Sequence, residues 1–275
     1  MRALIVCVAL LALPPLARAD VDTKPRVDEN GFRCHRVMSE YQGGVTEIKV
    51  LVPDQMEPGK RYPVVYVLPV EAGNGKQYGN GLVEIKKRDL HNKFGVICVE
   101  ITFSLLPWYA DHPTDPKIRQ ETYILKVVLP FIEQHYPVIK GRAGRLLLGF
   151  SKSGYGAFSL LLRHPDVFAK AAAWDAPFMM AAPNRFGMDG IYGNQENFEK
   201  YRLTKLMEQR AKDLGKPPRL AILGYDNFRS HHTDMQTLMQ RLGIPHEYRD
   251  EKKSPHTWHS GWVKPGVAWL VGSGK

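Results

Sequence analysis

A serine near the middle of the chain lies where an apolar run turns sharply into a stretch of small residues. The segment reads Leu146-Leu-Leu-Gly-Phe-Ser-Lys-Ser-Gly-Tyr-Gly-Ala157, with Ser151 at the turn. Such a strand–turn–helix lifts the hydroxyl clear of the backbone, and the N–H of the next residue, Lys152, can bind a developing oxyanion. The pattern is typical of a nucleophilic serine. It departs from Gly-x-Ser-x-Gly in one place, where Ser153 replaces the second glycine.

A serine hydroxyl becomes a strong nucleophile only when a base takes its proton, and a carboxylate usually orients that base. In parallel sheets such groups lie in the loops that follow strands. Asp226 follows an apolar run and a glycine, and Asp175 is its main rival because it also follows an expected strand. We favour Asp226 as the acid because it follows the second strand after the serine and precedes the histidine region.

Two histidines in Ser254-Pro-His-Thr-Trp-His-Ser-Gly-Trp262 compete for the role of base. His256 comes directly after the last expected strand and a turn that proline constrains, so we favour it. His259 lies nearer an expected terminal helix and would then line the pocket.

The second oxyanion donor should come from the loop after the strand that ends near Leu68. Pro69 has no N–H to donate, so Val70 or Glu71 is the better candidate. Aromatic and histidine side chains near the ends of expected strands are candidates for the substrate pocket, because Trp and Tyr combine an apolar body with a polar group. These candidates are Trp108, Tyr109, Tyr155, Trp258 and His259. For the first two, packing beneath a loop is an equally good interpretation.

The elements that must position these groups alternate between apolar runs and amphipathic segments. The runs predict strands at 45–52, 62–70, 95–101, 145–150, 169–174, 219–223 and 246–249. The amphipathic segments predict helices at 119–136, 154–163, 197–214, 233–242 and 261–271, with Pro130 expected to bend or divide the first. This alternation predicts an α/β fold with a mainly parallel sheet covered on both faces. A single domain over 45–275, preceded by an N-terminal arm or edge at 20–44, is the simplest account.

The first 19 residues predict a secretory signal peptide. Arg2 precedes an apolar run that ends at Leu13, and Ala17-Arg18-Ala19 matches a cleavage site, so we expect cleavage after Ala19. The apolar run is too short to span a bilayer. We therefore expect an exported protein, secreted or periplasmic, with no stable membrane insertion.

Composition limits the partners and cofactors. The formal net charge is +10, but the basic residues are scattered and no nucleic-acid motif accompanies them, so we expect no nucleic-acid partner. The histidines do not follow a zinc-binding spacing, so we expect no metal and no other cofactor. Cys34 and Cys98 could form one disulfide in an oxidising compartment or remain two separate buried thiols.

From Val45 to Leu270 the chain resembles the esterase D-like, or putative esterase, family of α/β-hydrolases. The strongest portion is Gly149–Ala157 followed by Leu161-Leu-Arg-His-Pro-Asp-Val-Phe168. The resemblance implies an α/β-hydrolase fold, with Ser151, Asp226 and His256 as nucleophile, acid and base. The family includes S-formylglutathione hydrolases, feruloyl and acetylxylan esterases and mycolyltransferases.

The function that we predict is an exported serine esterase that hydrolyses carboxylic esters through an acyl-enzyme. Its expected partner is a small-molecule or carbohydrate ester, which could belong to cell-wall material. An acyltransferase needs the same machinery, so the sequence leaves it open. A catalytically silent binding protein on the same scaffold is the alternative from another class, motivated by Ser153 and the altered loop at Pro69.

Overall fold

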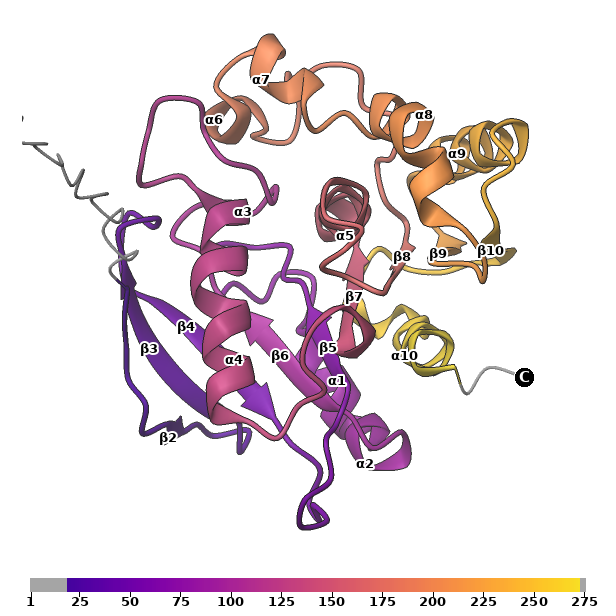
Figure 1. Ribbon diagram of the computed structural model, residues 1–275. Helices are drawn as coiled ribbons and strands as arrows, with labels where there is room; N and C mark the ends of the chain where they lie inside the picture. Colours follow the sequence, from indigo (N-terminus) through magenta and orange to yellow (C-terminus); the bar gives the residue numbers. More distant parts are fainter. Residues whose placement is uncertain (1–18, 273–275) are drawn as a thin grey trace, which may run out of the picture.

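The computed structural model describes residues 19–272, and a 10-stranded sheet runs through them (Figure 1). The strand order is β1-β3-β4-β6-β5-β7-β8-β9-β10, and β2 pairs with β3 off this path. The strands are β1 (Ala19–Val21), β2 (Arg26–Val27), β3 (Arg33–Ser39), β4 (Thr46–Leu51), β5 (Val64–Val67), β6 (Ile97–Ile101), β7 (Arg145–Phe150), β8 (Lys170–Trp174), β9 (Leu220–Tyr225) and β10 (His246–Lys253).

The part of the sheet from β6 to β10 is parallel, and the edge formed by β1 to β4 is antiparallel. The central strands are apolar and buried along both faces, as parallel strands covered by helices must be. This confirms the mainly parallel α/β architecture that the alternating sequence pattern predicts.

Helices cover both faces of this sheet (Figure 1). They are α1 (Gly81–Lys87), α2 (Leu90–Lys93), α3 (Gln120–Tyr123), α4 (Leu129–His135), α5 (Ser151–Arg163), α6 (Asp189–Tyr192), α7 (Gln195–Glu199), α8 (Leu203–Leu214), α9 (Arg229–Arg241) and α10 (Val263–Val271). The sheet separates two cores. On β5, Tyr66 faces the core that includes α4 and α5, whereas Val65 and Val67 face the core that includes α1 and α10.

The predicted helix around Pro130 runs on through a π-helical turn. A π-helical segment at Ile124–Val128 joins α3 to α4, and Pro130 lies at the start of α4. Since proline has no N–H, the widened turn immediately before it accommodates the missing hydrogen bond.

Residues 20–44, expected as an arm or edge, form β1 to β3 at the antiparallel edge of the sheet. Most of the predicted signal peptide, residues 1–18, lies outside the described residues. Cys34 and Cys98 are both free and buried. Within residues 19–272, no helix has both the length and the apolar character needed to cross a membrane.

Candidate active site

Ser151 lies at a strained turn between β7 and α5. Its φ of 52° is in the left-handed region, which residues other than glycine seldom adopt. The turn requires Gly149, because a Cβ there would lie 2.3 Å from the carbonyl oxygen of Ser153. A Cβ on Gly154 would lie 2.8 Å from that of Ala176. The close approach of the backbones at this turn therefore explains the glycines of the motif.

Ser153, the departure from the motif, stabilises the same turn. Its hydroxyl accepts the N–H of Phe150 at 3.0 Å and donates to the carbonyl oxygen of Phe150 at 2.8 Å. Because Ser153 is fully buried, water cannot reach its hydroxyl, and the two bonds with Phe150 provide the partners that the hydroxyl needs. The serine is thus compatible with the sharp turn that presents Ser151.

His256 is oriented by Asp175, and the prediction that Asp226 holds this ring is wrong. His256 Nδ1 is hydrogen-bonded to Asp175 Oδ2. The other carboxylate oxygen of Asp175 accepts the N–H of Phe228 at 2.8 Å. The main-chain N–H of Asp175 donates to the carbonyl oxygen of Gly224 at 3.1 Å. The physical reason is that β8 and β9 are parallel neighbours, so the loops that follow them meet at one edge of the sheet.

Asp226 lies at the same edge but binds the main chain of the histidine segment. Its Oδ2 accepts the N–H of His256 at 3.1 Å, and its Oδ1 is 3.2 Å from Lys253 Nζ. Asp226 therefore holds the backbone that carries His256, whereas Asp175 holds the ring.

The environment keeps Asp175 ionised beside the ring. Burial acts to raise the pKa of Asp175, but hydrogen bonds from His256 and from the N–H groups of Asp226 and Phe228 outweigh it and lower the pKa below its usual value. A charged carboxylate at Nδ1 stabilises an imidazolium and leaves Nε2 as the nitrogen that can exchange a proton. The rings of Tyr78, Phe150 and Phe228 surround His256, with centroids 5.4, 5.1 and 5.9 Å away.

Two of the predicted donors of main-chain N–H groups, Lys152 and Val70, line the same cavity as Ser151. Lys152 is the second residue of α5, so its N–H has no acceptor within the helix. Val70 follows β5 and lines the same cavity as Lys152 and Ser151. Glu71 does not line this cavity; its carboxylate accepts the N–H groups of Gln77 at 3.0 Å and Tyr78 at 3.3 Å. Of the two predicted candidates in this loop, Val70 is therefore the one that lines the cavity together with Ser151.

Ser151 and His256 line one cavity of about 450 Å³. Of the predicted pocket residues, Trp108 lines it, and its Nε1 donates to the carbonyl oxygen of Phe186 at 3.2 Å. Further lining residues are Tyr78, Pro177, Arg185, Phe186, Asn227 and Phe228, none of which the sequence singled out. Three of them share a position that the sequence could have indicated. Pro177, Asn227 and Phe228 closely follow the ends of β8 and β9, so a survey of every residue after a strand end would have included them.

The other four predicted pocket residues do not line this cavity. Tyr109 and Tyr155 are fully buried; the hydroxyl of Tyr109 donates to the carbonyl oxygen of Pro69, and that of Tyr155 donates to the carbonyl oxygen of Tyr201. Trp258 packs against Phe150 and Trp174, beneath the catalytic edge.

His259 pairs with Glu84 of α1 at 2.9 Å instead of facing the cavity. The prediction that it lines the pocket is therefore wrong. The reason is that the short 3-10 turn at Trp258–Ser260 directs His259 toward α1.

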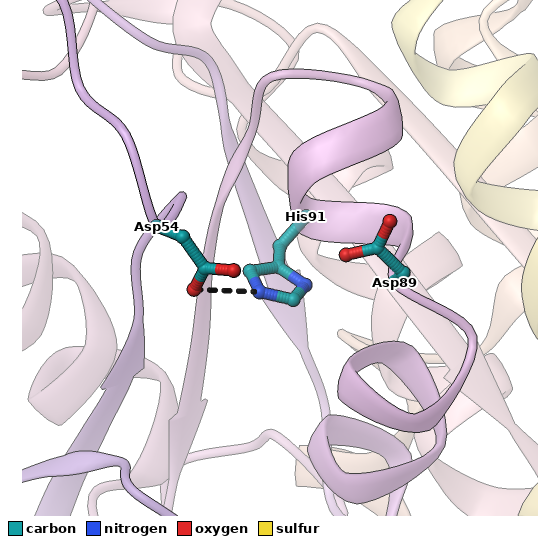
Figure 2. Close-up of side chains that lie close together, drawn as sticks. All are labelled: Asp54, Asp89 and His91. Carbon is teal, nitrogen blue, oxygen red and sulfur yellow. Dashed lines mark ion pairs between the residues drawn. The ribbon is translucent and has the colours of Figure 1, made fainter.

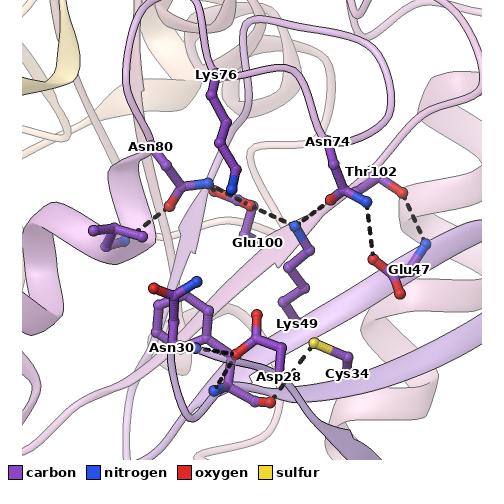
Figure 3. A network of polar contacts seen from close by, with 12 residues as sticks. Asp28, Asn30, Cys34, Glu47, Lys49, Asn74, Lys76, Asn80, Glu100 and Thr102 are labelled. Carbon is purple, nitrogen blue, oxygen red and sulfur yellow. Dashed lines mark hydrogen bonds and ion pairs between the residues drawn. The ribbon is translucent and has the colours of Figure 1, made fainter.

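A polar network supports the loop that carries Tyr78 (Figure 3). The amide of Asn80 donates to both oxygens of Glu100 at 2.9 Å, and its Oδ1 accepts the N–H of Val83 at the start of α1. Lys49 Nζ donates to Asn74 and lies 3.4 Å from Glu100. Glu100 and Lys49 are both buried, so this network anchors the loop to the sheet at Asn74 and at Asn80.

Sequence comparison relates part of the chain to known proteins. The family model described as Putative esterase matches residues 104–222, which include Ser151 and Asp175. Esterase Rv1288 of Mycobacterium tuberculosis is 28% identical over 147 residues, which is 52% of this chain and 32% of that protein. The match thus spans about a third of the length of this curated relative.

Two solved structures show the same fold at low sequence identity. FphF of Staphylococcus aureus, described as a fluorophosphonate-binding serine hydrolase, superposes with a TM-score of 0.71 at 19% identity, over 87% of this chain and 98% of that chain. A ferulic acid esterase gives a TM-score of 0.68 at 21% identity, over 94% of this chain and 98% of that chain. These likenesses confirm the α/β-hydrolase fold. On that fold, residues 104–222 of the chain match the model of the putative esterase family.

Proposed function

We propose that this protein is an exported serine esterase in which Ser151 is the nucleophile, His256 the base and Asp175 the residue that orients the base. One observation carries the proposal. Ser151 lies on a strained turn and shares a cavity with His256, whose ring is held through Nδ1 by a buried carboxylate. This combination is what a nucleophilic serine requires.

The proposed reaction has two stages. Ser151 Oγ attacks the ester carbonyl while His256 Nε2 takes the hydroxyl proton, and the N–H groups of Lys152 and Val70 bind the oxyanion. The alcohol leaves with the proton from His256, which forms the acyl-enzyme. Water then attacks the acyl-enzyme, again with His256 as base, and releases the acid.

The walls of the cavity suit an ester with an apolar part. Val70, Trp108, Phe186 and Phe228 provide apolar surface, and Asn227 provides a polar group. The substrate class that follows is a small-molecule or carbohydrate ester. Export rests on the predicted signal peptide at residues 1–19, and the test of it is the N-terminal sequence of the protein recovered from the medium or periplasm.

A fluorophosphonate probe tests the central assignment, because it reacts much faster with an activated serine than with an ordinary hydroxyl group. We expect covalent labelling of the wild-type protein and hydrolysis of p-nitrophenyl acetate, with both lost in Ser151→Ala. Ser159→Ala on the same helix is the matched control, since Ser159 is buried and does not line the cavity. A folded wild-type protein that neither labels nor hydrolyses the ester would support a catalytically silent binding protein instead.

A further inference from the structure

Three side chains with metal-ligating atoms converge at the edge of the sheet opposite to Ser151. Asp54 follows β4, Asp89 precedes α2 and His91 lies in α2, and one ligand atom from each lies within 4.8 Å of the others. The carboxylates of the two aspartates turn toward the ring of His91 (Figure 2). His91 Nε2 lies 3.8 Å from Asp54 Oδ1, too far for a direct hydrogen bond.

His91 is the observation that requires an explanation. It is 2% exposed, and neither ring nitrogen has a hydrogen-bond partner among the described residues. Buried polar groups are nearly always paired, and a metal ion bound to one ring nitrogen would give that nitrogen the partner that it lacks.

Asn92 holds the two carboxylates in place. Its amide nitrogen donates to Asp54 Oδ2 at 2.8 Å and to Asp89 Oδ1 at 2.7 Å, and its own oxygen accepts the N–H of Asp54 at 2.8 Å. One oxygen of each carboxylate remains available as a ligand. Such outer-shell bonds are characteristic of organised metal sites.

The nearby cations do not neutralise these carboxylates. Arg88 pairs with Glu84, Lys93 donates to the carbonyl oxygen of Arg88, and Lys86 donates to the carbonyl oxygen of Asn30. Within residues 19–272, neither aspartate forms an ion pair with a lysine or arginine. Two carboxylates without a cationic partner among these residues therefore lie beside the His91 imidazole.

We propose that Asp54, Asp89 and His91 bind a divalent first-row transition metal ion, for which Zn²⁺ is the probe. An imidazole with two carboxylates suits this class of ion, whereas Ca²⁺ and Mg²⁺ prefer ligands that are all oxygen. Three protein ligands leave at least one position for water.

The role that the topology supports is structural. β4 is antiparallel to β6, and Leu51 at the end of β4 pairs with Cys98 near the start of β6. Ser151 instead follows the end of β7, which runs in the same direction as β5 and β6. The ion would thus tie the loop after β4 to α2, far from the ester-binding edge.

The test is Zn²⁺ binding to the EDTA-treated full chain, measured by calorimetry and by thermal unfolding. We expect binding of Zn²⁺ and a rise in Tm for the wild-type protein. The double variant Asp54→Asn/Asp89→Asn should lose both, and Asn92→Ala should weaken binding by about tenfold. The aspartates are exposed, so this double variant leaves the core unchanged. Asp213→Asn/Asp234→Asn removes two other exposed carboxylates and is the matched control.

Two results would overturn the assignment. One is Zn²⁺ binding of equal affinity in the wild-type protein and in Asp54→Asn/Asp89→Asn, which would place the ion on other side chains. The other is a larger rise in Tm with Ca²⁺ or Mg²⁺ than with Zn²⁺ at the same concentration. Neither measurement depends on ester hydrolysis, so the outcome is independent of the proposed catalytic function.

Discussion

Asp175 and Asp226 both bind His256, but they bind different parts of it. Asp175 accepts a hydrogen bond from the ring at Nδ1, whereas Asp226 accepts the main-chain N–H at 3.1 Å. Only the first contact fixes which ring nitrogen carries the proton. The second fixes where the segment that carries the ring lies.

The two carboxylates should therefore differ in their effect on catalysis. Asp175→Asn should lower kcat by about 10³- to 10⁴-fold, because an amide in this position favours the wrong tautomer of the ring. Asp226→Asn keeps an acceptor for the N–H of His256, so we expect a loss of about tenfold or less. The measurement is kcat for p-nitrophenyl acetate, with circular dichroism as the control for folding. A larger loss in Asp226→Asn would return the acid to the position that the sequence favoured.

The elbow and the sheet could be predicted because their signals are local. Apolar runs mark β5 to β7, and glycines at 149 and 154 mark the close approach at the turn that carries Ser151. The choice of acid could not be made this way. Asp175 and Asp226 both follow strands, and the side chain that reaches the ring depends on how the loops after β8 and β9 pack together.

The pocket was harder to predict because aromatic residues serve cores as well as cavities. Tyr109 and Tyr155 have the composition expected of a substrate platform, yet both are fully buried and bind main-chain carbonyl groups. The glycine-rich stretch at 73–81 leads into α1, a short helix that the sequence pattern did not predict. Tyr78 lines the cavity from that stretch, which Asn80 ties to the buried Glu100.

Ser153 should prove to be a stabilising residue of the elbow. Ser153→Ala leaves the buried N–H of Phe150 unpaired, so we expect a loss of about 1–3 kcal/mol in the free energy of unfolding. Ser159→Ala is the control, since the Ser159 hydroxyl is buried in the same helix without a hydrogen-bond partner. Urea unfolding monitored by fluorescence measures both. Equal effects of the two substitutions would show that the Ser153 hydroxyl adds nothing to the turn.

His232 should make the protein sensitive to acid. His232 Nε2 accepts the main-chain N–H of Ala176, the residue after Asp175, at 2.9 Å. Because Nε2 accepts this hydrogen bond, it carries no proton and the ring is neutral. Burial, the largest cause, lowers the pKa of His232 to about 4. In the unfolded chain, the His232 ring binds a proton as the pH falls below its unfolded pKa of about 6.5. In the folded protein, it binds this proton only near pH 4. The free energy of unfolding therefore decreases as the pH falls between these two values.

From pH 7 to pH 5 this single group should cost about 2 kcal/mol of stability. His232→Gln offers an oxygen to the N–H of Ala176 but cannot be protonated, so the dependence of unfolding free energy on pH should become shallower. The exposed His135→Gln is the control. Urea titrations at pH 7, 6 and 5 measure the slopes, and identical slopes for wild type and His232→Gln would refute the argument.

The charge of the cavity should favour anionic esters. Lys152 and Arg185 both line it, and neither forms an ion pair with any residue between 19 and 272. Among the described residues that line the cavity, none is an aspartate or a glutamate. Burial lowers the pKa of Lys152, although Glu71 acts to raise it. A substrate carboxylate beside the Lys152 ammonium group would offset the free-energy cost of its burial away from water.

Two aryl esters with four-carbon acyl groups make the comparison, p-nitrophenyl hemisuccinate with a carboxylate and p-nitrophenyl butyrate without one. The measured quantity is the ratio of their kcat/KM values. Lys152→Met and Arg185→Met should each reduce the ratio of anionic to neutral ester by about fivefold, the equivalent of ~1 kcal/mol. Lys152→Met keeps the main-chain N–H proposed for the oxyanion, and Arg210→Met on α8 removes an exposed cation outside the cavity as the control. Added salt should lower the ratio in wild type more than in either cavity variant, because screening weakens only the charge contribution. A ratio that neither substitution nor salt changes would mean that apolar contacts alone select the acyl group.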